Sequence, residues 1–166
     1  NVPAASLRRL AEAGVITAPH ADAVAATQDR NVEKAFIESA GVPTAPHKAV
    51  RSLEDVEALE DSLFPGILKT ARLGYDGKGQ ARVSSREEAL AAWEKFGRTD
   101  CVLEKRLNLK TEVSVIICRN PQGDTVVFPV CENHHRNGIL AYTVMPARID
   151  AELAQRAQQF ARQIAD

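Results

Sequence analysis

The most informative segment of the sequence is KTARLGYDGKGQ, residues 69–80, which lies between two short apolar runs that predict strands. Glycines at positions 74, 77 and 79 allow the backbone to bend with its amides pointing inward, and Lys69 and Lys78 add positive charge. These features predict a phosphate-binding loop. The loop is not of the Walker A type, because Gly79 rather than Ser or Thr follows Lys78 and a strand follows the loop. Taken alone, the segment is equally compatible with a hairpin whose charges are solvated.

Charged residues interrupt the apolar runs on either side of this loop. An unpaired ammonium is costly in an apolar strand, so Lys69 should reach solvent along its stem or meet an anion. Glu104 is suited to accept the amino group of a purine, and Glu112 to accept the hydroxyls of a ribose. Alternatively, Glu104 or Glu112 forms a surface ion pair with Lys105 or Arg106, which would contribute little energy.

The first two thirds of the chain predict a compact α+β lobe. Helical spacing and capping signals predict helices over residues 4–13, 20–27, 30–40, 52–63 and 85–97. Asp29 is the expected N-cap of the third helix, and Ser85 and Glu88 form the expected capping box of the last. Apolar runs predict strands over residues 44–50, 67–70, 81–83 and 101–107.

The last third of the chain has a different sequence pattern. Strands are predicted over 112–119, 125–131 and 139–146, joined by turn-forming residues at 120–124 and 135–138. An antiparallel meander is the expected arrangement. A helix over 150–166 should pack on one face of it.

Several motifs together resemble a known family. They are GYDGKGQ (74–80), CENHHRNGIL (131–140), QDR (28–30), the Glu33–Lys34 pair and GVPTAP (41–46). The pattern resembles the ATP-grasp enzymes and, more narrowly, the N5-carboxyaminoimidazole ribonucleotide synthetases. The resemblance covers essentially the whole chain.

This resemblance implies an α+β ATP-grasp fold with a small lid lobe and the first antiparallel strands of the large lobe. Residues 1–28 would be helices connecting from an N-terminal domain, 29–111 the lid lobe with its glycine-rich flap, and 112–166 the start of the large lobe. We expect the chain to be a fragment, because Asn1 is not an initiator Met and the final helix has no stop signal.

The resemblance also implies residue roles. Lys69 would hold the α- and β-phosphates of ATP, and Glu112 would bind the ribose. Arg30 and His135 match positions that contact the nucleotide. The flap over the phosphates would comprise Gly74, Tyr75, Asp76, Gly77, Lys78, Gly79 and Gln80, and the adenine hinge Glu104, Lys105, Arg106 and Leu107. Tyr75, Asp76 and Lys78 would also face the substrate.

Family members use ATP and bicarbonate to form carboxyphosphate and then carboxylate the amine of 5-aminoimidazole ribonucleotide. This chemistry needs charge neutralisation and exclusion of water, so no side chain is expected to act as a nucleophile. The Mg²⁺ ligands are expected outside this segment, since Glu132 and Asn133 lie too early in the chain. The segment alone should lack synthetase activity, and the full-length enzyme should be a cytoplasmic homodimer.

Two alternatives stay open. The chain is either part of another ATP-grasp ligase, such as a formate-dependent glycinamide ribonucleotide transformylase, or a non-catalytic nucleotide-binding module. The Tyr75–Asp76 pair in the flap argues against the transformylase. With a nucleotide-free site, residues 72–79 are expected to be among the least ordered of the chain.

Composition limits the classes of partner. A formal net charge of -1 provides no overall field for nucleic acid or an anionic membrane, and no apolar run is long enough to span a bilayer. The three cysteines lie in apolar runs without CxxC spacing, which predicts buried reduced thiols. His134 is expected to be a surface residue, and His20 and His47, for which the sequence offers no partner, are expected to be exposed.

Overall fold

The computed structural model describes residues 2–74, 78–136 and 138–166. Tyr75, Asp76 and Gly77 of the predicted flap lie outside the described residues. The chain divides into two compact units, the first comprising Asn1–Glu38 with Thr44–Arg106 and the second Ser39–Pro43 with Leu107–Asp166. The lobe boundaries that the family resemblance implies stay a prediction.

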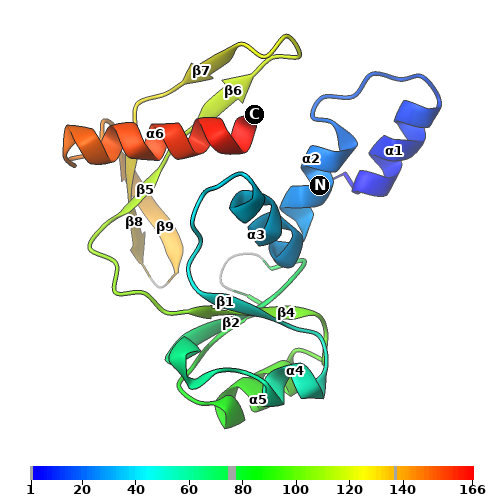
Figure 1. Ribbon diagram of the computed structural model, residues 1–166, viewed down its shortest axis with the longest axis vertical. Coiled ribbons are helices and arrows are strands. Elements are labelled where there is room, and N and C mark those ends of the chain that lie inside the picture. The colour runs from blue at the N-terminus through cyan, green and yellow to red at the C-terminus, as the bar shows by residue number, and fades with distance from the viewer. Residues whose placement is uncertain (1, 75–77, 137) are drawn as a thin grey trace. The chain divides into compact units, whose positions relative to one another are not determined.

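The first unit contains five α-helices and a four-stranded antiparallel sheet among its described residues (Figure 1). The helices are α1 (Ala4–Glu12), α2 (Ala21–Gln28), α3 (Arg30–Ser39), α4 (Leu53–Glu57) and α5 (Arg86–Lys95), with a 3-10 turn η1 at Asp61–Leu63. The strands are β1 (His47–Val50), β2 (Gly66–Thr70), β3 (Gln80–Val83) and β4 (Cys101–Lys105), in the order β1-β4-β2-β3.

Alternation along the strands divides the side chains between two faces of this sheet. One face packs on α4 and α5, and its core includes Val50, Leu68 and Leu103, which are fully buried, and Trp93 from α5. The Trp93 indole nitrogen donates a hydrogen bond to the Thr99 carbonyl at 2.9 Å, so its polar edge is also satisfied. In Figure 1, α3 lies on the opposite side of the sheet from α4 and α5.

Capping residues set the helix boundaries largely as predicted. Asp29 accepts hydrogen bonds from the amides of Asn31 and Val32 at the start of α3. The Ser85 hydroxyl accepts from the Glu88 amide at 3.3 Å, but the Glu88 carboxylate accepts from the Ser84 amide instead of closing the predicted box on Ser85. Ser52 caps α4 in the same way.

The predicted helix over 52–63 is wrong in length. The structure ends α4 at Glu57 and resumes with the 3-10 turn. The Arg86 guanidinium donates to the Leu59 carbonyl at 2.6 Å, which satisfies an acceptor that has left the helical ladder. Leu59 and Leu63, on either side of the break, both lie in the core.

Among its described residues, the second unit has two separate antiparallel sheets instead of the predicted single meander. Strands β5 (Glu112–Ser114), β8 (Cys131–Arg136) and β9 (Ile139–Val144) form one sheet, and β6 (Ile117–Arg119) and β7 (Thr125–Val127) form the other. The predicted strand 112–119 is thus divided between them. The meander prediction failed because β8 reads CENHHR, whose charged residues lack the apolar pattern of a strand.

The last helix, α6 (Ala151–Ala165), confirms the predicted helix and packs against β6. Arg162 donates to the Thr125 hydroxyl at 2.8 Å, and Gln158 donates to the Phe128 carbonyl at 3.2 Å. These contacts attach α6 to the two-stranded sheet.

Several side-chain expectations need correction. Cys101 and Cys131 are buried free thiols, and burial raises the pKa of Cys101 to about 11, whereas Cys118 is exposed. His20 is exposed but caps α2, because its Nδ1 accepts from the Asp22 amide. His47 is half-buried beside Glu38 rather than exposed.

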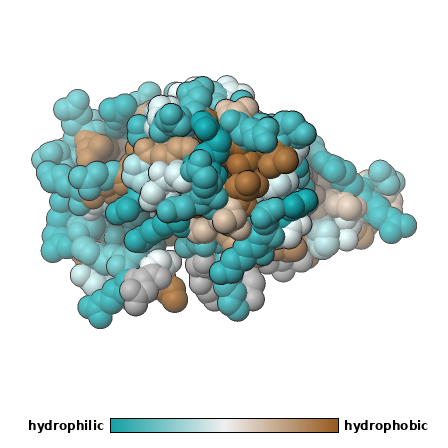
Figure 2. Space-filling model, turned by 90° about the horizontal axis from the view of Figure 1, so that it is seen from below, coloured by the Kyte–Doolittle hydropathy of each residue, from teal (hydrophilic) through white to brown (hydrophobic). Residues whose placement is uncertain are grey.

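The surface fits the composition. Figure 2 shows a face that is hydrophilic over most of its area, with hydrophobic residues in separate patches. Within the described ranges, no helix is long and apolar enough to cross a membrane.

Candidate nucleotide-binding site

Lys69 and Glu104 meet on the sheet face that is turned away from α4 and α5. Glu104 lies directly opposite Ile67 on β2, so Lys69, two residues further along, projects from the same face. The Lys69 ammonium lies 2.9 Å from Glu104 Oε2. The expectation that Lys69 meets an anion is confirmed, and the alternative surface pair between Glu104 and Lys105 or Arg106 is wrong.

A second cation, Lys34 of α3, completes this cluster. Its ammonium lies 3.3 Å from the other oxygen of Glu104, Oε1. Burial alone would raise the pKa of the Glu104 carboxyl, but the hydrogen bond and charge of Lys69, with the charge of Lys34, hold that pKa below its usual range. Glu104 is therefore ionised at neutral pH, and the three groups carry a net positive charge.

The ends of the glycine-rich loop are held next to this cluster. The Thr70 amide donates to the Gly79 carbonyl at 2.8 Å, and Gln80 lies directly opposite Lys69 on β3. Gly79 has a φ of +69°, and a Cβ there would lie 2.6 Å from the Thr70 hydroxyl oxygen, so both the conformation and the contact require glycine.

Arg30 is fixed at the other end of the loop. Its amide donates to the Ala71 carbonyl at 2.9 Å, and its guanidinium would lie 3.3 Å from a Cβ added at Gly74. Asp29 holds Arg72 through a 2.9 Å hydrogen bond. Arg30, Arg72 and Gly74 line part of a pocket of about 810 Å³ at the start of the loop. The start of α3 and the start of the loop are thus joined.

The predicted hinge residues have less freedom than expected. The Lys105 amide donates to the Pro46 carbonyl at 2.8 Å and the Arg106 amide to the Pro65 carbonyl at 2.9 Å. These two amides are therefore already satisfied, and the hinge role that the resemblance gives to Glu104, Lys105, Arg106 and Leu107 stays a prediction. The Leu107 amide has no acceptor within the part of the chain that the structure describes.

In the second unit, Glu112 and His135 form a pair. Glu112 on β5 lies opposite Asn133 on β8, and His135 follows two residues later on the same face. His135 Nδ1 contacts a Glu112 carboxylate oxygen directly. Two residues to which the resemblance gives nucleotide contacts are therefore neighbours, and the alternative pairing of Glu112 with Lys105 or Arg106 is wrong.

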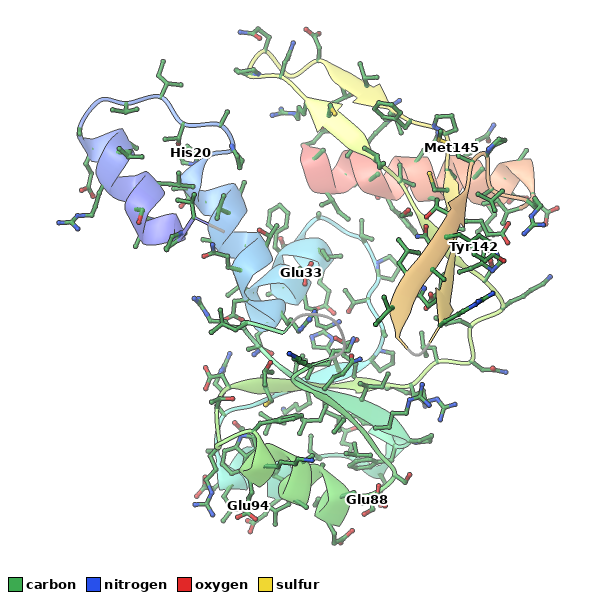
Figure 3. All side chains as sticks on the ribbon, turned by 180° about the vertical axis from the view of Figure 1, so that it is seen from behind. His20, Glu33, Glu88, Glu94, Tyr142 and Met145 are labelled. Atoms are coloured by element: carbon green, nitrogen blue, oxygen red, sulfur yellow. The ribbon has the colours of Figure 1, made fainter. Side chains whose placement is uncertain are left out.

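The opposite face of β8 carries a polar network that the sequence did not predict. Glu132 is only 7% exposed and accepts two side-chain hydrogen bonds from Arg148, at 2.8 and 3.1 Å, and one from the Arg148 amide. His134 Nε2 lies 2.8 Å from Glu132, and its ring stacks on Tyr142 of β9 (Figure 3). Arg148 holds the pKa of Glu132 down to about 2. His134 is therefore not a simple surface residue.

Most of the chain matches a known protein family. Residues 35–166 match the model of the ATP-grasp domain. The chain belongs to the ATP-grasp family.

Relatives of this ATP-grasp chain are more specific in name. It is 38% identical, over 99% of its length, to the N5-carboxyaminoimidazole ribonucleotide synthase of Brucella melitensis, of which it covers 46%. A crystal structure of an ADP complex of N5-carboxyaminoimidazole ribonucleotide synthetase matches all of the chain with a TM-score of 0.90 and 38% identity, over 44% of that protein. The Staphylococcus aureus enzyme complexed with ADP matches 99% of the chain with a TM-score of 0.89 and 34% identity, over 43% of that protein. The chain thus spans less than half of the length of these relatives.

A magnesium site in this ATP-grasp chain would need a suitable group of ligand side chains. Mg²⁺ prefers several oxygen ligands in near-octahedral geometry. Among residues 2–74, 78–136 and 138–166, no group of three or more His, Cys, Asp or Glu side chains is placed to hold a metal ion. The Glu132 carboxylate is already occupied by Arg148 and His134. The described residues therefore do not form a magnesium site by themselves.

The sequence did not indicate three contacts of this candidate site. Lys34 holds Glu104, Asp29 holds Arg72, and the Thr70 amide holds the Gly79 carbonyl. The sequence marked Asp29 only as a helix cap and Lys34 only as part of the Glu33–Lys34 motif, although Lys34 stands four residues after Arg30 and so on the same side of α3.

Proposed function

We propose that this chain is the ATP-binding portion of a ligase that carboxylates the amine of 5-aminoimidazole ribonucleotide in purine biosynthesis. The observation that carries the proposal is Lys69, held by Glu104 at the start of the glycine-rich loop, on the sheet face turned away from α4 and α5. The names of the relatives, at 34% to 38% identity over nearly the whole chain, supply the substrate class.

In the proposed reaction, bicarbonate attacks the γ-phosphorus of ATP, which gives carboxyphosphate and ADP. The amine of the ribonucleotide then attacks the carboxyphosphate carbon, and phosphate leaves. Phosphoryl transfer depends mainly on positioning and charge neutralisation. Lys69 supplies a cation for the phosphates, and the loop amides supply further donors. Arg30 stands at the start of the loop, where it adds positive charge near Gly74.

The remaining predicted contacts form part of the same proposal. Glu112 and His135 would bind the ribose and the nucleotide, and their direct contact on one sheet face supports a common role. Tyr75, Asp76 and Lys78 would face the ribonucleotide when the loop covers the site. Covering the site excludes water from carboxyphosphate, which hydrolyses readily.

Nucleotide titration of this chain tests the binding part of the proposal. ADP should bind, raise the melting temperature and protect residues 72–79 from proteolysis, whereas Lys69→Met should strongly weaken binding and reduce both effects at the same ADP concentration. Lys48→Met is the matched control, because it removes one lysine charge from an exposed position on β1. The absence of any ADP effect on the wild-type chain would reject the site.

An assay of the gene product that carries this sequence tests the reaction. We expect bicarbonate-dependent release of ADP that 5-aminoimidazole ribonucleotide stimulates. Release without this stimulation would favour another ATP-grasp ligase, and formate-dependent release with glycinamide ribonucleotide would identify the transformylase. We also propose that this product is a cytoplasmic homodimer, with Mg²⁺ ligands contributed outside residues 1–166, and sedimentation would measure its mass.

A further inference from the structure

Three polar side chains of helix α3 contact the rest of the first unit. The helix contributes no fully buried residue. Asn31 donates to the Cys101 carbonyl at 3.3 Å, Lys34 reaches Glu104, and the Glu38 carboxylate accepts from the Thr44 hydroxyl at 2.5 Å. These positions are three and four residues apart, so they share one side of the helix. Figure 3 marks Glu33, the neighbour of Lys34, on α3.

The Asn31 and Glu38 contacts attach α3 to Cys101 and Thr44, whereas the Lys34 contact reaches Glu104 in the proposed phosphate site. Glu104 divides its two oxygens between two lysines, Lys69 on Oε2 and Lys34 on Oε1. The side chains of Lys34, Glu104 and Lys69 are 12%, 16% and 22% exposed, so Lys69 is the most accessible of the three. A bound phosphate must draw on the Lys69 ammonium, which Glu104 already holds.

We propose that Lys34 is a positioning residue that lets Lys69 bind phosphate, because it keeps the Glu104 carboxylate paired when Lys69 turns to the ligand. This inference rests on the proposed nucleotide-binding function and adds a residue to it. Without Lys34, moving Lys69 toward a phosphate would leave a half-buried carboxylate without a cation, which is costly. With Lys34, one cation stays on Glu104 and the other is available. The cluster of Lys34, Lys69 and Glu104 also keeps its net positive charge when Lys34 is present.

Comparing ADP with adenosine separates this role from a general stabilising one. Lys34→Met should weaken ADP binding about tenfold, the size of a typical coupling between sites, and leave adenosine binding unchanged. Lys34→Arg should restore ADP binding. Asn31→Ala is the matched control, because it also removes a contact between α3 and the sheet but none to Glu104. It should lower the melting temperature and change both ligands equally or not at all.

A double-mutant cycle tests whether Lys34 acts through Lys69. In a Lys69→Met background, Lys34→Met should have no further effect on ADP affinity. An additive loss would overturn the proposal, as would unchanged ADP affinity in Lys34→Met.

A measurement without nucleotide distinguishes failure of this inference from failure of the proposed function. Carboxyl NMR titration should show the pKa of Glu104 rising in Lys34→Met relative to wild type. An unchanged Glu104 titration would overturn the role of Lys34 even if ADP binds to the wild-type chain. A changed titration with no ADP binding by the wild type would instead reject the nucleotide site and, with it, the positioning role.

Discussion

Two largely buried carboxylates of this molecule, Glu132 and Glu104, are paired with cations in different ways. Glu132 in the second unit meets one guanidinium at both oxygens, a backbone amide and a histidine ring, so all of its acceptors are used by one compact group. Glu104 in the first unit is shared between two lysines that come from separate elements, α3 and β2. Both carboxyl groups have a lowered pKa, but the Glu104 cluster has two lysines for one carboxylate, so one of its cations is spare.

The difference is that between a fixed and an exchangeable ion pair. A planar guanidinium on both oxygens of a carboxylate fixes the geometry of the pair. Point-charge lysines can exchange partners, because each ammonium is attached through a flexible stem. An ion pair with exchangeable cations next to a glycine-rich loop is therefore a better indicator of a site than a strongly shifted pKa alone.

The largest expected effect comes from removing one cation of each cluster. Lys69→Met should weaken ADP binding about a hundredfold, the scale for truncating one member of a partly buried charge pair, while changing the melting temperature little because Lys34 still pairs with Glu104. Arg148→Met should do the reverse, lowering the melting temperature and leaving ADP affinity unchanged. Calorimetry with ADP measures the affinity of both variants, and thermal unfolding measures their melting temperatures. If both variants lose stability and binding together, the distinction between the two clusters is wrong.

The sequence predicted the elements of the first unit better than those of the second. Residues 67–70, 81–83 and 101–107 carry apolar strand patterns, and Asp29 and Ser85 carry capping signals, so their positions followed from local chemistry. In the second unit, β8 is a strand whose charged side chains are satisfied by Arg148, twelve residues after its end. A partner that far along the chain leaves no periodic signal in the strand itself.

The candidate site follows the same rule. Lys69 and Glu104 were predicted because each interrupts an apolar run, and the sequence indicated that each needs a partner. It did not indicate that they are partners of each other, since that depends on the register of β2 against β4. Lys34 was missed because a lysine on a helix is ordinarily solvated. The direct contact of Glu112 with His135 likewise depends on strand pairing.

A smaller effect is expected from glycine replacements that test how tightly the loop end is fixed. Gly79→Ala should cost about 2 to 3 kcal/mol, because a left-handed backbone strains alanine and the new methyl group would collide with the Thr70 hydroxyl. Thr70 cannot turn away freely, since its hydroxyl donates to the Arg72 carbonyl at 3.0 Å.

Gly97→Ala is the matched control for this replacement. Gly97 has a similar φ of +76°, but an added Cβ would meet nothing within 4 Å, so only about 1 kcal/mol of backbone strain is expected. Chemical denaturation measures both values. Equal losses at the two positions would show that Thr70 does not hold the loop end.

The smallest effect concerns the acid stability of the second unit. Because the folded-state pKa of Glu132 is lowered from 4.5 to about 2, its contribution to stability is complete above pH 4.5 and is lost as the pH falls toward 2. Glu132→Gln removes the titrating group, so the melting temperatures of wild type and variant should differ most above pH 4.5 and converge toward pH 2. Glu12→Gln on α1, which replaces an exposed carboxylate, should follow the wild-type curve. A constant difference between wild type and Glu132→Gln from pH 7 to pH 2 would mean that Arg148 stabilises the fold through packing rather than through the charge of Glu132.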